Sequence, residues 1–385
     1  MDRWRLASDR FLLRMRAAMW TLMMMAPLFG AEVPVYIGTY TGAQSQGIYV
    51  ARFNLETGVL STPELAAETA NPTFLALHPT GKYLYAVSEV NNHRGEKAGG
   101  VSAFSIDPKT AKLTLINQVS SHGTGPCHVS VDRTGATLMV ANYGGGSVAA
   151  FTLGGDGRLH ESTSFHQHFG KSADARRQER AHAHSINPSP GNRFAVAADL
   201  GTDKLYVYRL DAHSGTISPH VPESVATAAG AGPRHFAFHP DGRHGYAVNE
   251  LDNTVTSYEW DEGAGELKAK GSVTALPAGF TGTSYTAEIR VHPSGKFLYA
   301  SNRGDDSIAV FSLANPGAPK AVQHISTGGV QPRNFTLDKA GKWLLAANQR
   351  TGNVAVFKVD GATGRLTDTG GRIEVGSPVC LRLLE

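Results

Sequence analysis

Several common signatures of enzymes and metal sites are absent from this chain of 385 residues. It has only two cysteines, too few for a disulfide framework or a cysteine-rich zinc site. It has no Gly-x-Ser-x-Gly elbow and no Walker-type loop, which argues against an α/β-hydrolase nucleophile and a P-loop nucleotide site. The apolar run at 17–29 is too short to cross a bilayer comfortably. Glycine, by contrast, is abundant, with 43 residues.

Residues 1–31 differ in kind from the rest of the chain. Five arginines precede the apolar run, and the small residues Gly30 and Ala31 follow it. This order resembles a secretory signal peptide, so we predict a cleaved segment at 1–31 and a mature domain at 32–385, periplasmic or secreted. The alternative is a misplaced start codon before a cytosolic protein. Residues 32–385 hold 31 basic and 31 acidic residues, which suggests no nucleic-acid partner and no membrane surface.

One sequence pattern recurs six times along the chain, and residues 72–89 are its first copy. A short alternating strand leads to a turn with glycine, and a second strand ends at Asn or an acid. The turn glycines are Gly81, Gly135, Gly191, Gly242, Gly295 and Gly341, spaced by 54, 56, 51, 53 and 46 residues. A period of about 50 residues built from strands and turns is typical of a β-propeller, in which each repeat forms one blade.

Each repeat continues with a second hairpin and a fourth strand, which predicts four antiparallel strands per blade. Residues 35–40 and 47–50 look like a seventh repeat without its first strand, and 377–383 look like the missing strand. Pairing of the two ends would close the ring, so we predict an all-β fold, a seven-bladed β-propeller in one domain. Because Cys127 and Cys380 begin strands of blades that are not neighbours, we expect two free thiols.

A propeller brings the same position of every blade to one axial opening, here called the mouth. The position eight residues after each turn glycine supplies Glu89, Tyr143, Asp199, Glu250, Arg303 and Gln349, with Tyr40 from the incomplete blade. The first strands supply Phe74, His128, His184, His235, Glu288 and Asn334, with Arg234 and Arg333 one place earlier. Buried charge is unfavourable unless it is paired or used, so this crowding predicts a catalytic pocket. The alternative is a salt-bridged, solvated channel without a ligand.

Six motifs follow one another between Val35 and the C-terminus: His182-Ala183-His184-Ser185, Gly232-Pro233-Arg234-His235, Ala247–Leu251, Ala287-Glu288-Ile289, Ser301–Gly304 and Gln331–Asn334. In this order they resemble the lactonase family of seven-bladed propellers, which contains 6-phosphogluconolactonases and fungal carboxy-muconate lactonizing enzymes. The resemblance implies an active-site histidine at His184, two arginines at Arg234 and Arg303, and an acid at Glu250. The N-terminal segment argues against the cytosolic pentose-phosphate role that the family suggests.

Lactone opening needs an activated water, a stabilised oxyanion and a proton for the leaving alkoxide. A neutral His184 can take the proton of water, because its ordinary pKa of about 6.5 suits neutral pH. Glu250 can orient that imidazole or be the base itself. Arg234 and Arg303 can bind a carboxylate, a phosphate or the oxyanion through their planar forks. A cycloisomerase would use the same set in reverse, with a carboxylate as the attacking group and the acid/base residue moving a proton at carbon.

Eight further residues are expected to bind substrate: His128, His182, Glu288, Arg333, Arg177, Gln178, Asn302 and Gln349. Arg177 and Gln178 belong, with Lys171, to a long connection between two blades that should lie over the mouth. The alternative is that this connection is a charged, solvated loop.

Histidine pairs offer a rival chemistry. Two His-x-His pairs, His166 with His168 and His182 with His184, could supply four imidazoles to zinc or another transition metal. The first pair lies in a loop, and a catalytic metal usually recruits a carboxylate, so we predict no metal and no cofactor. The histidines of the His-Pro turns repeat between blades and are predicted to be structural: His78, His239 and His292.

The function predicted from these residues is hydrolysis of a sugar-acid lactone, either 6-phosphogluconolactone or, in an exported protein, an unphosphorylated aldonolactone. A muconate-type cycloisomerase is the second hypothesis. The third is a non-catalytic propeller that binds a protein or ligand, which would need an apolar or aromatic patch that the sequence does not clearly show. The expected partner is a small lactone, and the expected state is a monomer or a weak dimer.

Overall fold

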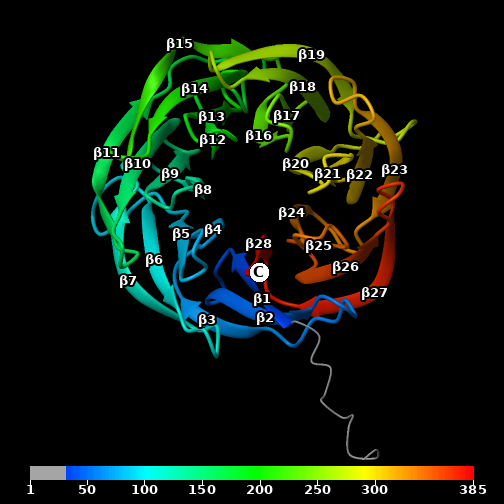
Figure 1. Ribbon diagram of the computed structural model, residues 1–385, viewed down its shortest axis with the longest axis horizontal. Coiled ribbons are helices and arrows are strands. Elements are labelled where there is room, and N and C mark those ends of the chain that lie inside the picture. Colours follow the sequence, from blue (N-terminus) through cyan, green and yellow to red (C-terminus); the bar gives the residue numbers. More distant parts are fainter. Residues whose placement is uncertain (1–31) are drawn as a thin grey trace, which may run out of the picture.

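The computed structural model describes residues 32–385 as seven four-stranded sheets around a central channel (Figure 1). The predicted all-β, seven-bladed propeller is confirmed. The signal peptide predicted at 1–31 lies outside the described residues. Within 32–385, no helix has the length and apolar character needed to cross a membrane.

Every blade repeats one strand order from the channel outward, and neighbouring strands are antiparallel. The innermost strands are β4 (Leu75–Leu77), β8 (Pro126–Val131), β12 (Ala183–Pro188), β16 (Pro233–Phe238), β20 (Tyr285–Val291), β24 (Pro332–Leu337) and β28 (Pro378–Leu383). The second strands are β5 (Tyr83–Ser88), β9 (Thr137–Asn142), β13 (Phe194–Asp199), β17 (His244–Asn249), β21 (Phe297–Arg303), β25 (Trp343–Asn348) and β1 (Glu32–Thr39).

The two outer strands of each blade follow in the same blade order. The third strands are β6 (Gly100–Ile106), β10 (Ser147–Leu153), β14 (Lys204–Asp211), β18 (Thr254–Asp261), β22 (Ser307–Ser312), β26 (Asn353–Val359) and β2 (Gly47–Asn54). The outermost strands are β7 (Leu113–Ser120), β11 (Leu159–Gln167), β15 (Thr216–Ala226), β19 (Glu266–Thr274), β23 (Lys320–Ser326), β27 (Leu366–Glu374) and β3 (Glu64–Glu68).

The ring closes as the sequence predicts, with β28 as the innermost strand of the sheet β28-β1-β2-β3. Its pairing with β1 is antiparallel and places Leu381 opposite Ile37. Both side chains are fully buried. Figure 1 shows the C-terminus beside the channel, next to β1. One blade is therefore built from both ends of the described chain.

The inner strands divide their side chains between the blade interfaces and the channel. One core-facing residue per inner strand is buried between blades: Leu75, Val129, Ile186, Phe236, Ile289, Phe335 and Leu381. Because side chains alternate along a strand, the residues on either side of each of these face the channel. The apolar interfaces thus hold the blades together, while polar side chains can occupy the axis.

The His-Pro turns join neighbouring blades, as predicted. Nε2 of His78 lies 3.0 Å from the carbonyl oxygen of Gly135, the turn glycine of the next blade. His239 makes the same contact with Gly295 at 2.7 Å. Gly135 has a φ of +79°, and a Cβ there would approach the His78 ring to 2.3 Å, so both backbone conformation and space require glycine.

One of the predicted turn glycines is wrong. In the turn between β12 and β13 the left-handed residue is Asn192, with a φ of +58°, and not Gly191. The Asn192 N–H donates to the Ser189 carbonyl at 3.0 Å, as the turn glycines do in other blades. Asparagine tolerates this conformation better than most residues. The turn residue of this blade therefore lies one position later than predicted. Eight residues after Asn192 is Leu200, so Leu200 and not Asp199 occupies the mouth position of this blade.

Ring closure can be tested by ending the chain before β28. Without Pro378–Leu383 the edge of β1 loses its partner, and three buried side chains, Val379, Cys380 and Leu381, leave the core. Burial of each large apolar side chain contributes roughly 1.5–3 kcal/mol, so we expect a much lower melting temperature and aggregation in light scattering. A chain that ends at Leu383 is the control. An unchanged melting temperature after removal of β28 would contradict closure by this strand.

Candidate active site at the mouth

A β-bulge near the start of the inner strands determines which side chains reach the mouth. In β12 the pairing with β13 passes from Ala183 to Ser185 and leaves His184 without a partner. Such a bulge bends the strand and redirects the extra side chain. Five strands leave one residue unpaired in this way, and these residues are Cys127, His184, Arg234, Arg333 and Val379. His184 is therefore equivalent to Arg234, which corrects the alignment of His184 with His235.

Glu250 is the centre of a cluster of arginines at the mouth. It follows β17 and is only 4% exposed. Its Oε1 lies 2.6 Å from Arg177 Nη2, and its Oε2 lies 3.0 Å from Arg234 Nε and 2.7 Å from Arg303 Nη2. Arg234 comes from a bulge, Arg303 ends β21, and Arg177 belongs to the connection between β11 and β12. Three of the four residues predicted as catalytic thus meet, and the predicted loop arginine joins them.

The arginines fix the charge of Glu250. Burial raises the pKa of the Glu250 carboxyl, but Arg303, Arg234 and Arg177 outweigh this and hold its pKa far below the ordinary range. Burial and the nearby Arg303 and Arg333 lower the pKa of Arg234 to about 9. Glu250 is therefore a carboxylate at neutral pH and a poor proton acceptor. One carboxylate among three guanidinium groups leaves the mouth positive.

His184 lies beside this cluster and not within it. The oxygens of Glu250 bond to arginines, and no bond joins Glu250 to His184. Nδ1 of His184 is 3.6 Å from Cys127 Sγ, and Nε2 has no hydrogen-bond partner among residues 32–385. Burial, followed by Arg234, His235 and Arg333, lowers the pKa of His184 well below its ordinary value. The imidazole is neutral at pH 7 and can accept a proton through Nε2.

Arg333 lies at the mouth beside Tyr40, which links it to a second acid, Glu89. Its Nη2 lies 3.4 Å from the Tyr40 hydroxyl, and its guanidinium stacks over the Tyr40 ring at 5.6 Å. The Tyr40 hydroxyl donates to Glu89 at 2.8 Å, and Thr73 donates to the second oxygen of Glu89 at 2.5 Å. Glu89 and Tyr40 were predicted at the rim, and they complete the mouth on this side.

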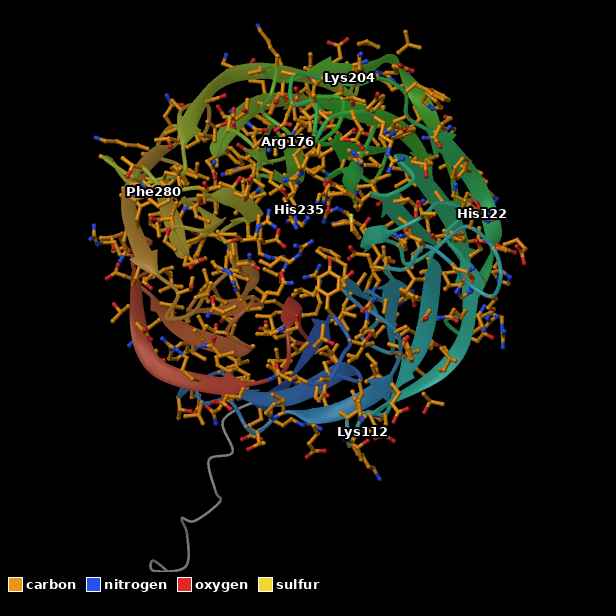
Figure 2. The ribbon with its side chains drawn as sticks, turned by 180° about the vertical axis from the view of Figure 1, so that it is seen from behind. Lys112, His122, Arg176, Lys204, His235 and Phe280 are labelled. Carbon is orange, nitrogen blue, oxygen red and sulfur yellow. The ribbon has the colours of Figure 1, made fainter. Side chains whose placement is uncertain are left out.

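A layer of side chains closes the channel beneath the mouth. This layer, here called the floor, consists of Phe74, His128, His235 and Glu288. His128 stacks on Phe74 with ring centroids 4.3 Å apart, and His235 Nδ1 lies 3.0 Å from Glu288 Oε1. Figure 2 shows His235 beside the channel, whereas His122 and Lys112 lie near the outer edge. The predicted residues His128 and Glu288 thus belong to the floor.

His235 connects the floor to the arginines of the mouth. Its Nε2 lies 3.1 Å from Arg234 Nη1. Burial lowers the pKa of His235 to about 4, and Glu288 opposes this shift. Neutral His235 therefore supports Arg234 from below. The prediction placed His235 at the rim but gave it no role, because an isolated sequence does not show that it touches Arg234.

Two of the predicted substrate-binding side chains make other contacts. The Gln178 amide donates to the Leu200 carbonyl at 2.9 Å and to Asp203 at 2.7 Å. The Asn302 amide donates to the Ala275 carbonyl at 2.8 Å. Gln349 is half-buried, and its part in substrate binding stays a prediction. The first two side chains therefore hold loops in place, and the amide donors of both are in use.

The four histidines of the two His-x-His pairs do not converge. His166 Nε2 lies 2.9 Å from the Ile217 carbonyl, and both nitrogens of His168 are bonded, to Asp199 and Tyr208. His182 contacts the Tyr143 carbonyl at 3.0 Å and Glu179 at 3.2 Å, and stacks on the Tyr143 ring. The zinc site considered for these histidines is therefore not formed.

One group in 32–385 has three possible metal ligands close together: His239, Asp241 and His244. It lies in the turn between β16 and β17, away from the mouth. Nε2 of His239 is already bonded to the Gly295 carbonyl, and its Nδ1 accepts the Asp241 backbone N–H at 3.1 Å. Hydrogen bonds thus explain the arrangement of this group.

Cys127 was not predicted as part of the mouth. It occupies the same bulge position as His184 and lies against that ring, and burial raises the pKa of its thiol. Both cysteines are buried and free, as expected. The sequence could have revealed this. If the inner strands are aligned with one extra bulge residue near each start, Cys127 falls in line with His184, Arg234 and Arg333.

Comparison with known proteins identifies the family of this chain. Residues 34–383 match the family model described as "Lactonase, 7-bladed beta-propeller". The 6-phosphogluconolactonase of Bacillus subtilis is 39% identical over 350 residues, covering 91% of this chain and 97% of the relative. That of Formosa agariphila is 36% identical over 341 residues, covering 86% of this chain and 94% of the relative.

Solved structures share the whole ring. The periplasmic gluconolactonase of Pseudomonas aeruginosa superposes with a TM-score of 0.85 at 32% identity, covering 92% of this chain and 99% of the other. The family model at residues 34–383 includes strands of all seven blades, β1 and β28 among them. The chain therefore belongs to the lactonase family of seven-bladed β-propellers.

Proposed function

We propose that this protein hydrolyses the lactone ring of a sugar acid at the mouth. The observation that carries this proposal is a neutral histidine with a free Nε2 beside guanidinium groups that a buried carboxylate holds in place. The named relatives support the same reaction class, since two are 6-phosphogluconolactonases and a structural neighbour is a periplasmic gluconolactonase.

The roles of the residues follow from their charge states. His184 accepts a proton from water as the water oxygen attacks the lactone carbonyl carbon. Arg303 and Arg177, whose side chains are 12% and 34% exposed, stabilise the oxyanion and any acidic substituent. The bond between that carbon and the ring oxygen then breaks, and the protonated His184 returns its proton to the leaving alkoxide. Glu250 holds the arginine forks in position.

The substrate class follows from the positive mouth. A sugar-acid lactone with a phosphate would gain charge-assisted hydrogen bonds there, and an unphosphorylated aldonolactone would still place its polarised carbonyl against a guanidinium. The test is a panel of both kinds with purified 32–385, with spontaneous hydrolysis subtracted. Enzymatic opening of at least one supports the proposal. Turnover of a muconate alone would identify a cycloisomerase, and no turnover of any would leave a binding protein.

Replacement of His184 tests the base. Changing His184 to Gln should lower kcat by ~10²–10⁴, the usual contribution of a positioned acid or base, without changing the melting temperature greatly. The exposed His160, changed to Gln, is the matched control and should keep the wild-type rate. Wild-type activity in the His184 variant would exclude it as the proton acceptor.

The pH profile tests the same residue independently. The neutral imidazole is the active form, and its pKa lies well below about 6.5. As pH falls, activity should therefore persist through pH 6.5 and be lost only at more acidic values, where His184 gains a proton. Initial rates corrected for spontaneous opening would show this profile. A loss of half the activity near pH 6.5 or above would assign the base to another group.

The role of the planar guanidinium group of Arg303 can be tested separately from the role of its positive charge. Changing Arg303 to Lys keeps the charge but removes the planar donor pair, so the loss in kcat/KM should be nearly as large as for Arg303→Ala. Arg209, an exposed arginine of β14, changed to Lys provides the control. Full activity in Arg303→Lys would show that a point charge is sufficient, and the fork would then have no special role.

We also propose that the protein is exported after cleavage near Ala31. The arginines and apolar run of residues 1–31 support this, and one structural neighbour is a periplasmic enzyme. Intact mass spectrometry of protein from the native cell should find an N-terminus near Ala31 or Glu32. An intact Met1 in the cytosolic fraction would contradict export.

A further inference from the structure

The channel has a second polar cavity, on the other side of the floor from the mouth. It has a volume of about 470 Å³ and is lined below the floor by the ends of the inner strands and by their turns. Lining residues such as Pro240 and Pro293 lie where the inner strands turn into the second strands, which is the opposite end from Glu250. We call it the basal cavity. The proposed lactone chemistry does not use it.

Two arginines from non-adjacent blades face this cavity at the same depth. Arg290 lies on β20, two residues after the floor residue Glu288, and Arg382 occupies the equivalent position on β28. Residues two apart on a strand face the same side, so each arginine lies directly below the level of the floor. Arg382 has no ion-pair partner among residues 32–385, and its guanidinium stacks over Phe74 at 4.6 Å. Arg290 reaches the Phe335 carbonyl at 2.7 Å, and its contact with Glu288 is long, at 3.7 Å. Their charges are thus poorly compensated.

The acidic side chains of the cavity are committed elsewhere. Glu288 accepts from His235, from Asn334 and from the backbone N–H of Ile289. Asp338 accepts the backbone N–H of Trp343 at 2.7 Å. Burial lowers the pKa of Arg290, Glu288 opposes this shift, and the like charge of Arg382 adds to it.

Neutral donors and small side chains complete the cavity. The Asn187 side chain lines the cavity, and its amide makes no hydrogen bond to residues 32–385. Ala76 and Ala237 occupy the equivalent position on other blades and leave room at the axis. The lining thus presents donors around a space that suits a small anion.

We propose that the basal cavity is a second binding site, separate from the mouth, for a compact anion that carries phosphate or carboxylate groups. Arg290 and Arg382 would bind its oxygens from two sides, and the Asn187 amide would donate to it. A bound anion relieves the repulsion between the two arginines, which provides a physical reason for affinity. The floor prevents a ligand here from touching His184.

The test measures the binding of inorganic phosphate and of malonate to the full mature chain, by calorimetry and by the shift in melting temperature. Low ionic strength is needed because salt screens partly exposed charges, and sodium chloride at matched ionic strength is the reference. The variants are Arg382→Gln, which removes a donor, and Ala237→Asp, which adds a carboxylate to the cavity. Arg303→Gln alters the mouth only, and Arg209→Gln is a surface control.

We expect one binding event for phosphate, malonate or both that is about tenfold weaker or worse in the two basal variants. This event should be unchanged in Arg209→Gln and in Arg303→Gln, which can alter only anion binding at the mouth. Which anion binds better shows whether phosphate or carboxylate chemistry is favoured. Absence of binding to the wild type, equal binding to all variants, or loss only in Arg303→Gln would each overturn the proposal. If Arg382→Gln fails to fold, Ala237→Asp decides the question, because Ala237 also lines the cavity.

Discussion

The pairing of β28 with β1 is the constraint on which the geometry of the axis depends. It places the last strand of the chain innermost in the blade that begins at Glu32, and so removes the free edges of an open sheet. Closure brings distant segments together at the mouth. Arg333 and Tyr40 are 293 residues apart in sequence and yet in contact. A catalytic pocket made from several blades exists only because the ring is closed.

The inner strands have to satisfy two demands, and the bulges reconcile them. Each strand buries an apolar side chain between blades, which fixes its register. A bulge near its start lets an extra residue point into the mouth without shifting that register. The mouth can then carry several charges, since Glu250 compensates its arginines. The floor separates this charged layer from the basal cavity, where Arg290 lies 3.7 Å from Glu288 and Arg382 has no ion-pair partner among residues 32–385.

The fold could be predicted because the same sequence pattern occurs in each complete blade, and every copy indicates the same local structure. Closure, the His-Pro contacts and the meeting of Arg234, Glu250 and Arg303 all followed from that repeat. Errors arose where one residue broke the pattern. Asn192 can adopt a turn conformation usual for glycine, which displaced Asp199 by one position. Polar side chains such as Gln178 and Asn302 look functional in sequence, but only the structure shows that they satisfy loop backbone.

A crystal structure of mature protein with 6-phosphogluconate, the product of opening the phosphorylated lactone, would test the central claim most directly. If lactones open at the mouth, the sugar acid should lie there, with its carboxylate within hydrogen-bond distance of Arg303 or Arg177 and its C1 carbon beside His184 Nε2. An ordered sugar acid that touches neither His184 nor these arginines would contradict the account.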